Sequence, residues 1–184
     1  MAKSTQAIRI EPLAGRVAGA AGVALTPAGP ATRVSLRADP ANAKALSKAL
    51  GLDLPLAPKT SSGNKQGRLA AWLGPDEWLI IDETGDPIAD LAKAKVLHSA
   101  VDVSHRNTAI LVGGDGARGT LEAGCPQNLG DSAFPIGAAS RTVMGKIEVV
   151  IIRTGETEFR VECWRSFSDY VFGFLSEAAK DCLA

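Results

Sequence analysis

An approximate internal repeat is the feature that most constrains the fold of this 184-residue chain. Residues 32–36 (TRVSL) align with residues 108–112 (TAILV), and residues 74–78 (GPDEW) align with residues 155–159 (GETEF). The two members of the second pair are slightly farther apart in the sequence than the two members of the first pair, which indicates one loop insertion. A repeat that starts with a strand and continues through a helix to a hairpin predicts an α+β fold. We expect two similar βαββα halves whose mainly antiparallel sheets are covered by helices.

The first half shows the elements of the repeat most clearly. Residues 32–37 alternate like a half-buried strand, and Asp39 and Pro40 begin a helix that stops at Gly51. The pattern then predicts a flexible loop at 57–67, hairpin strands at 68–73 and 78–82, a helix at 86–94 and a strand at 97–103. The second half repeats this order with a strand at 108–112, a helix at 115–123, a loop, a hairpin and a final helix at 166–182.

Residues 1–30 differ from the rest of the chain in composition. They are rich in Ala, Gly and Pro and have no sustained periodicity, which predicts a loosely ordered N-terminal arm. Residues 31–184 have the length of one domain, and we expect a single α+β domain with halves at about 31–104 and 105–184.

Charge and cysteine content exclude several classes of protein. Lys and Arg total 20 and Asp and Glu total 20, so no net field favours nucleic acid or an anionic membrane as a partner. Apolar runs are far shorter than the roughly 20 residues that cross a bilayer. Cys125, Cys163 and Cys182 are odd in number and widely spaced, which favours a reducing cytoplasm over a disulfide framework or a thiolate metal site.

The segment from Gly114 to Gly119 matches the dinucleotide-binding pattern G-x-G-x-x-G after an expected strand. We interpret it as a helix start instead, because Asp115 stands where a helix N-cap is needed and its carboxylate would repel a pyrophosphate. The chain then enters the turn GCPQNL rather than a second parallel strand. The motif therefore does not predict nucleotide binding.

Asp102, Ser104 and His105 supply the side chains of a hydrolase triad within four residues. In a strand, Asp102 and Ser104 share one face and His105 points to the other, so the three do not converge. We expect Asp102 and Ser104 to bond to the turn at 104–107. His98 and His105 are the only histidines and lack closely spaced metal-binding partners, although a general acid or base built from Asp102 or Glu77 stays open.

Aromatic residues give the main candidates for a partner surface. Trp72, Trp78, Phe159 and Trp164 fall in expected hairpins, where core packing is the usual role and an interface is the alternative. In the final helix an apolar stripe at three-and-four spacing is expected to face the core; it comprises Phe167, Tyr170, Val171, Phe174, Leu175 and Ala178. Phe172 falls off this stripe. Trp164, Arg165 and Phe172 are therefore the candidate partner interface.

Six short motifs in a fixed order carry a resemblance to a known family. They are LGPDEWL at 73–79, VDVSHR at 101–106, GCPQNL at 124–129, FP with a following G at 134–137, RT at 141–142 and WRSFSDY at 164–170. Each motif alone is common, but their joint order is specific. The chain resembles the gamma subunit of heterotetrameric sarcosine oxidase, and residues 1–30 carry almost none of the resemblance.

The resemblance implies a fold like the folate-binding aminomethyltransferase of the glycine cleavage system. It implies a non-catalytic, structural subunit of the cytoplasmic complex that demethylates sarcosine to glycine and passes the methyl carbon to tetrahydrofolate. In that family FAD, FMN, NAD, tetrahydrofolate and zinc are associated with the other subunits, which are alpha, beta and delta. We therefore assign no catalytic, cofactor-binding or metal-binding residue to this chain.

A free-standing folate-binding or aminomethyltransferase-like protein is the alternative, because the implied fold binds folate in its relatives. A reduced folate needs a buried carboxylate for its pterin and a central pocket with basic groups for its glutamate tail. A chain of 184 residues leaves little for the walls of such a pocket. A third possibility is a chain that only assembles into some other complex.

Overall fold

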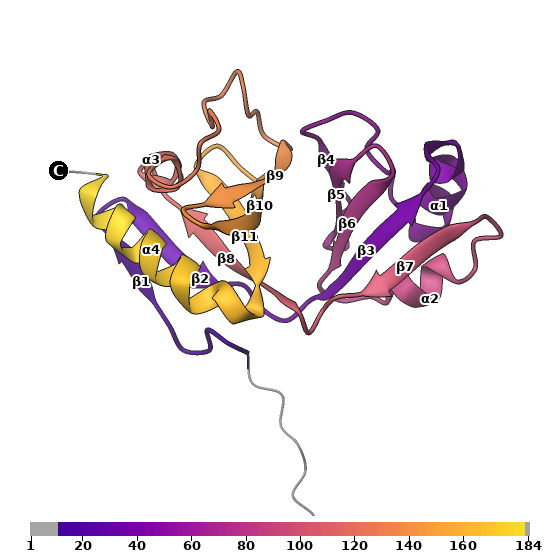
Figure 1. The fold of residues 1–184 in the computed structure, drawn as a ribbon, viewed down its shortest axis with the longest axis horizontal. Helices are drawn as coiled ribbons and strands as arrows, with labels where there is room; N and C mark the ends of the chain where they lie inside the picture. Colours follow the sequence, from indigo (N-terminus) through magenta and orange to yellow (C-terminus); the bar gives the residue numbers. More distant parts are fainter. Residues whose placement is uncertain (1–10, 183–184) are drawn as a thin grey trace, which may run out of the picture.

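Two antiparallel sheets lie face to face between two pairs of helices in the computed structural model, which describes residues 11–182 (Figure 1). Helices α1 (Ala43–Leu50) and α2 (Pro87–Leu91) cover the outer face of one sheet. Helices α3 (Ala117–Glu122) and α4 (Ser168–Asp181) cover the outer face of the other sheet. Short 3-10 turns at Pro40–Asn42 and Arg165–Phe167 precede α1 and α4. The layers run helix, sheet, sheet, helix, which confirms the expected α+β class. Within residues 11–182, every helix is too short or too polar to span a membrane.

The two sheets have six and five strands. Sheet A has the order β1-β2-β8-β11-β10-β9 and sheet B the order β4-β5-β6-β3-β7. The strands of sheet A are β1 (Ala18–Ala20), β2 (Val23–Pro27), β8 (Asn107–Gly113), β9 (Ala139–Met144), β10 (Ile147–Arg153) and β11 (Glu158–Trp164). The strands of sheet B are β3 (Thr32–Ala38), β4 (Ser61–Gly63), β5 (Arg68–Gly74), β6 (Glu77–Asp82) and β7 (His98–Asp102).

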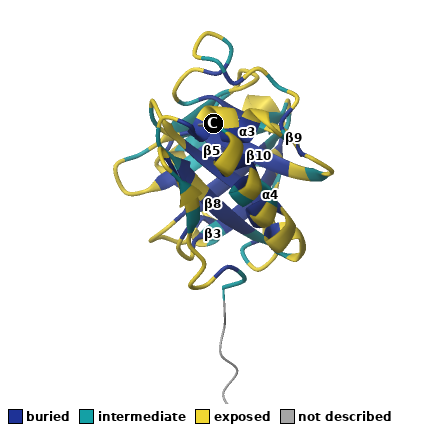
Figure 2. Ribbon diagram, turned by 90° about the vertical axis from the view of Figure 1, so that its left-hand side faces the viewer, coloured by how far each residue is buried: buried dark blue, intermediate teal, exposed yellow. Residues whose placement is uncertain are grey.

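Strand alternation divides the apolar residues among three layers. In β6, Trp78 packs toward α1 and α2 while Leu79 faces sheet A. In β10, Val149 packs toward α3 and α4 while Val150 faces sheet B. Figure 2, which looks onto α3 and α4, shows the buried strands of sheet A behind the exposed outer side of α4. The central strands are thus buried on both faces.

The strand order reproduces the repeat seen in the sequence. β3, α1, β4, β5, β6 and α2 of the first half have the same order and neighbours as β8, α3, β9, β10, β11 and α4 of the second. Each half contains three consecutive antiparallel strands where a two-stranded hairpin was expected. In the first half the additional strand is β4, which lies in the expected flexible loop at 57–67 and pairs with β5. The short, polar Ser61–Gly63 segment lacks the alternation that would have indicated a strand.

The expected loosely ordered arm is wrong for the described residues that follow residue 10. β7 closes the first half beside β3, and β2 takes the corresponding place beside β8 in the second half. Leu13 and Leu25 are buried in the core that α3 and α4 cover. The N-terminal segment therefore supplies a strand that the second half lacks. The expectation for residues 1–10 lies outside the described residues.

The glycines of the G-x-G-x-x-G segment serve close packing. Gly114 has φ +105°, and a Cβ there would lie 2.2 Å from the carbonyl oxygen of Gly22 in the β1–β2 turn. The amide of Gly116 donates to the same oxygen at 3.1 Å. α3 starts after Gly116, which corrects the expected capping role of Asp115. Since β8 pairs antiparallel with both neighbours, the parallel βαβ unit that a dinucleotide site requires is not formed there.

Replacing Gly114 with alanine should destabilise the fold by about 3 kcal/mol, because it combines positive-φ strain with a backbone clash. Urea unfolding measures the change. Gly113→Ala is the matched control, since a Cβ at Gly113 meets nothing within 4 Å. Equal stabilities for the two variants would contradict the packing of the β1–β2 turn against Gly114.

Arg68 ties the first half together from its buried position in β5. Its Nε donates to Asp82, its Nη1 donates to the Leu50 carbonyl at the end of α1, and its Nη2 bonds to Asp90 in α2 at 2.8 Å. Burial opposes the ionisation of Asp82, but the Thr84 and Gly85 amides together with Arg68 outweigh it and lower the Asp82 pKa. Burial also opposes the charged form of Arg68, but its hydrogen bonds to Asp82 and Asp90 outweigh this effect and raise the Arg68 pKa.

The lowered pKa of Asp82 gives stability a definite dependence on pH. The ionised Asp82 carboxylate should contribute fully to the free energy of unfolding above the ordinary carboxyl range, about pH 4. This contribution should be lost as the pH falls through the lowered Asp82 pKa. Asp82→Asn should cost about 3 kcal/mol at pH 7 and should remove this part of the acid dependence. Urea midpoints between pH 7 and pH 3 test this. An Asp82→Asn variant whose midpoint falls with acid as steeply as the parent's would contradict it.

Candidate partner interface

A buried ion network joins the two sheets. Arg33 of β3 donates to Glu162 of β11 at 2.7 Å, and Arg160 donates to the other oxygen of Glu162 at 2.8 Å. Arg160 also reaches Glu83, which follows β6, at 3.3 Å. Glu162 is only 1% exposed. A carboxylate buried this deeply is stable only because each oxygen accepts from a guanidinium.

The second sheet explains why the sequence pattern did not reveal this network. Arg33, Ser35 and Arg37 occupy alternate positions of β3, which the pattern marks as the solvent face of a half-buried strand. Sheet A covers that face, so Arg33 is buried. Only the pairing of two distant segments, 33 and 162, shows that the charge has a partner.

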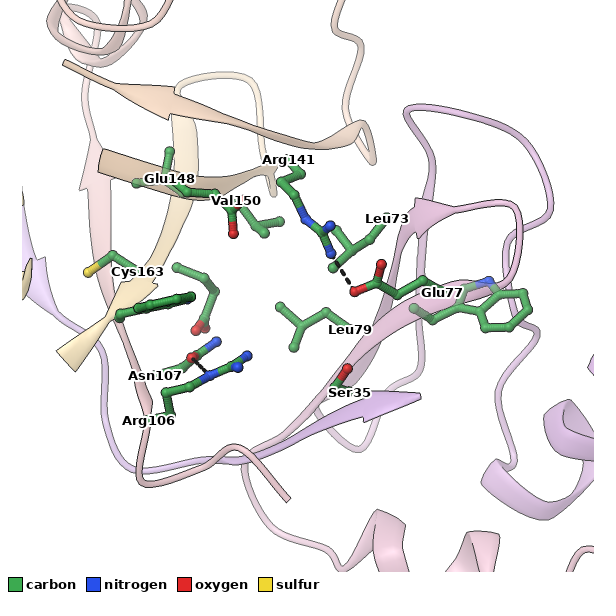
Figure 3. A pocket seen from close by; sticks show the side chains of 14 residues that line it. Ser35, Leu73, Glu77, Leu79, Arg106, Asn107, Arg141, Glu148, Val150 and Cys163 are labelled. Atoms are coloured by element: carbon green, nitrogen blue, oxygen red, sulfur yellow. Dashed lines mark hydrogen bonds and ion pairs between the residues drawn. The ribbon is translucent and has the colours of Figure 1, made fainter. Parts of the chain in front are cut away.

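A small polar cleft lies beside the network, between the sheets (Figure 3). Figure 3 shows Arg141 of β9 reaching across it to Glu77 of β6, and the two form an ion pair. The cleft has a volume of about 50 Å³, which is room for one or two waters, whereas ligand sites usually hold 300–1,000 Å³. Burial raises the pKa of the adjacent Cys163 thiol to about 12, so this thiol stays protonated.

An exposed aromatic cluster stands at the mouth of the cleft. Trp164 is 41% exposed and stacks on Phe167 with ring centroids 6.0 Å apart. The Arg106 guanidinium lies 5.3 Å from the Trp164 ring, and the Arg165 amide donates to the Arg106 carbonyl at 2.7 Å. We call Arg106, Trp164, Arg165 and Phe167 the Trp164 surface. Two of the three expected interface residues, Trp164 and Arg165, belong to it.

The third expected interface residue, Phe172, is a core residue. It is 5% exposed and packs in the core of the second half, with Arg16 stacked 5.8 Å from its ring. The buried face of α4 is turned by about one position from the expected stripe and comprises Ser168, Val171, Phe172, Leu175, Ala178 and Ala179. Tyr170 and Phe167 are instead exposed. The reason is that α4 also packs on β1 and β2, which the sequence pattern did not reveal.

The triad-like residues form a local turn. The Ser104 hydroxyl donates to Asp102 and accepts from the Arg33 amide at 2.9 Å, and the Ser104 amide also donates to Asp102 at 2.8 Å. His105 is exposed at the tip of the turn. This confirms the interpretation of Asp102 and Ser104 as turn residues. The turn fixes the start of β3 against the connection between the halves.

The remaining candidates divide between core and surface. Trp78 and Phe159 are buried as expected, while Trp72 is half-buried. His98 bonds to the Val96 carbonyl at 2.8 Å. In the part of the chain that the structure describes, no three His, Cys, Asp or Glu side chains gather as metal ligands. Glu77, one of the open acid–base candidates, is paired with Arg141.

Two packed sheets built from a repeated strand–helix unit define a protein of the aminomethyltransferase fold class. The crystal structure of glycine cleavage system aminomethyltransferase T from Bartonella henselae has a TM-score of 0.60 with this chain. The likeness covers 87% of this chain and 49% of that one. At 16% identity it shows the fold alone.

Residues 35–181 match the sarcosine oxidase gamma subunit family. Sarcosine oxidase subunit gamma of Corynebacterium sp. (strain U-96) is 30% identical over 173 residues, which are 91% of this chain and 84% of that one. The protein of the same name from Arthrobacter sp. is 32% identical over 153 residues, covering 80% and 75%. One chain of the heterotetrameric sarcosine oxidase from Corynebacterium sp. U-96, solved with pyrrole 2-carboxylate, has a TM-score of 0.87 at 29% identity, covering 96% and 97%. The chain belongs to the sarcosine oxidase gamma subunit family, as its motifs indicated.

Replacing Glu162 with glutamine should destabilise the protein by about 3–5 kcal/mol, because it leaves the Arg33 and Arg160 charges without their shared buried counter-charge. Urea unfolding gives the magnitude. Glu158→Gln in the same strand is exposed and should change stability by less than about 0.5 kcal/mol. Should Glu162→Gln behave like this control, the network would have no role in holding the sheets.

Proposed function

We propose that this chain is the gamma subunit of a heterotetrameric sarcosine oxidase and that it supplies structure and partner contacts but no catalytic residues. The observation that carries the proposal is the likeness over nearly the whole chain, TM-score 0.87, to a chain of that assembly. The complex demethylates sarcosine oxidatively to glycine and transfers the methyl carbon to tetrahydrofolate. The partners are the alpha, beta and delta subunits, and the complex works in the cytoplasm.

The cofactors FAD, FMN, NAD and tetrahydrofolate are carried by the other subunits in this proposal. The filled space between the sheets supports this, because the cleft of about 50 Å³ is far smaller than a folate or a dinucleotide. Glu162, the buried carboxylate between the sheets, is committed to Arg33 and Arg160 rather than available to a pterin.

The Trp164 surface is the partner contact of this subunit. Tryptophan and arginine dominate the binding energy of interfaces, because they bury large areas around a few directed contacts. Trp164 and Arg106 already hold each other in one geometry, so little side-chain entropy is lost when a partner covers them. Phe167 extends the same apolar surface.

Purification of the tagged chain from its own cells tests the assembly. The eluate should contain flavin-bearing larger subunits and should form hydrogen peroxide when sarcosine is added. A chain that elutes alone, colourless and holding folate would support the free-standing folate binder instead. Stable association with other proteins in the absence of sarcosine turnover would place the chain in a different complex.

Replacing Trp164 with alanine should weaken association with the other subunits by about 30-fold, which corresponds to a hot-spot loss of about 2 kcal/mol. Titration of the labelled chain against the remaining subunits measures this. Tyr170→Ala removes an equally exposed aromatic from α4 whose ring packs on Phe174 rather than on Trp164, and it should change affinity by less than about threefold. Equal effects of the two substitutions would refute the assignment of the interface to Trp164.

A further inference from the structure

Three of the four sheet edges in the described residues are short or covered by the chain itself. β1 and β4 have three residues each. At the start of β9, the Ala139 amide bonds to the Lys59 carbonyl at 3.4 Å and Gln127 bonds to the Ser140 hydroxyl at 2.9 Å, so the stretch of β9 beyond these contacts is 141–144, which is shorter than β7. β7 has five residues and ends sheet B with β3 as its one paired neighbour. β7 is therefore the longest open edge.

At this edge, some backbone amides and carbonyls of β7 are not used in the pairing with β3. The Val103 amide donates to the Arg33 carbonyl at 2.8 Å. Because hydrogen-bonding pairs alternate along an antiparallel ladder, Val101 and Ser99 also direct their backbone groups toward β3. The amides and carbonyls of His98 and Ala100 then lie in the plane of the sheet and point away from β3, past its open edge.

Two apolar side chains lie exposed along this edge, whose other residues are mostly polar. Leu97 is 88% exposed and Val101 is 53% exposed. Leu97 directly precedes β7 and lies four residues before Val101, so both side chains fall on one face if the extended chain continues to Leu97. The sequence HSAVD has no proline and no lysine, which are the residues that usually block an open edge. An edge with this composition favours the addition of another strand.

The second half of the molecule shows this position filled. β7 lies beside β3 as β2 lies beside β8, and β2 carries a further antiparallel strand, β1, on its outer edge. The place beside β7 is thus equivalent to the place that β1 occupies. β1 itself is the small apolar sequence AGA, so an extended apolar segment fits such a site.

We propose that β7 receives an extended, apolar segment of one of the larger subunits as an added antiparallel strand. This inference rests on the proposed function, because it needs a multi-subunit assembly. The added strand bonds to the outward groups of His98 and Ala100 and packs its apolar side chains beside Leu97 and Val101. A larger subunit is the occupant rather than a second copy, because the relative of highest structural likeness described above comes from a heterotetramer.

Hydrogen exchange in the intact complex, resolved to single amides, tests the added strand. The outward amides of His98 and Ala100 should exchange at least about 100-fold more slowly in the complex than in the purified chain. The inward amides of Ser99 and Val101 are bonded to β3 in both forms, and they serve as an internal reference.

Two variants test the contact independently. Ala100→Pro removes the outward N–H while the ladder to β3 uses the neighbouring residues, and it should weaken assembly by at least about 30-fold. Ala100→Ser keeps the N–H and should assemble within about threefold of the parent. Val101→Lys should likewise weaken assembly, with Val143→Lys in β9 as its matched control, because Val143 is an exposed valine on an edge strand of the other sheet. Urea unfolding confirms that each variant is folded.

Slow outward amides together with the loss of assembly in Ala100→Pro or in Val101→Lys would establish the strand addition. Fast outward amides in an intact, active complex would overturn it while leaving the proposed function in place. Protection of the same amides in a homodimer of the purified chain would also overturn it, in favour of pairing between two copies. If the unaltered chain does not associate with flavin-bearing subunits, the proposed function itself fails.

Discussion

The shared carboxylate of Glu162 is the interaction on which the relative placement of the two halves depends. Between the sheets, Leu79, Val150 and their neighbours contribute apolar burial, which favours contact but has no direction. The bonds from Arg33 and Arg160 do have direction, and they connect a strand of the first half with a strand of the second. Apolar contact therefore holds the sheets together, and the ion network sets how they lie against each other.

This arrangement decides what the interior of the subunit can do. A relative with the same fold, aminomethyltransferase T, is an enzyme, and this chain matches about half of its length. Here the space between the sheets is taken up by apolar side chains, by the Arg–Glu network and by the Arg141–Glu77 pair, and the cleft that is left has about 50 Å³. The filled interior supports the proposal that this subunit acts through contacts on its outer surface.

The sequence predicted the elements that depend on local chemistry. Asp39 accepts the Ala41 amide ahead of α1, and Gly51 ends that helix in the left-handed conformation, as expected from Asp-Pro and Gly at those positions. The turn after β5 and the Asp102–Ser104 turn are also local, and both were predicted. The errors share a different origin: β2 pairs with a strand more than eighty residues later, and Arg33 finds its counter-charge at residue 162. Periodicity within a window contains no information about such partners.

Phe172 shows how one missed pairing carries through to the candidate site. Helical spacing locates the centre of a buried stripe, but the width of the stripe depends on how many strands lie beneath the helix. Because the N-terminal segment adds β1 and β2 to sheet A, α4 packs on a wider sheet and its buried face turns toward Phe172. The added strands beneath α4 do not affect Trp164. It lies at the end of β11 on the face toward sheet B, beyond the part of the space between the sheets that Arg33 fills. The exposure of an aromatic side chain at a strand end depends on local position, so Trp164 is exposed as a partner contact would need, whereas Phe172 is buried in the core.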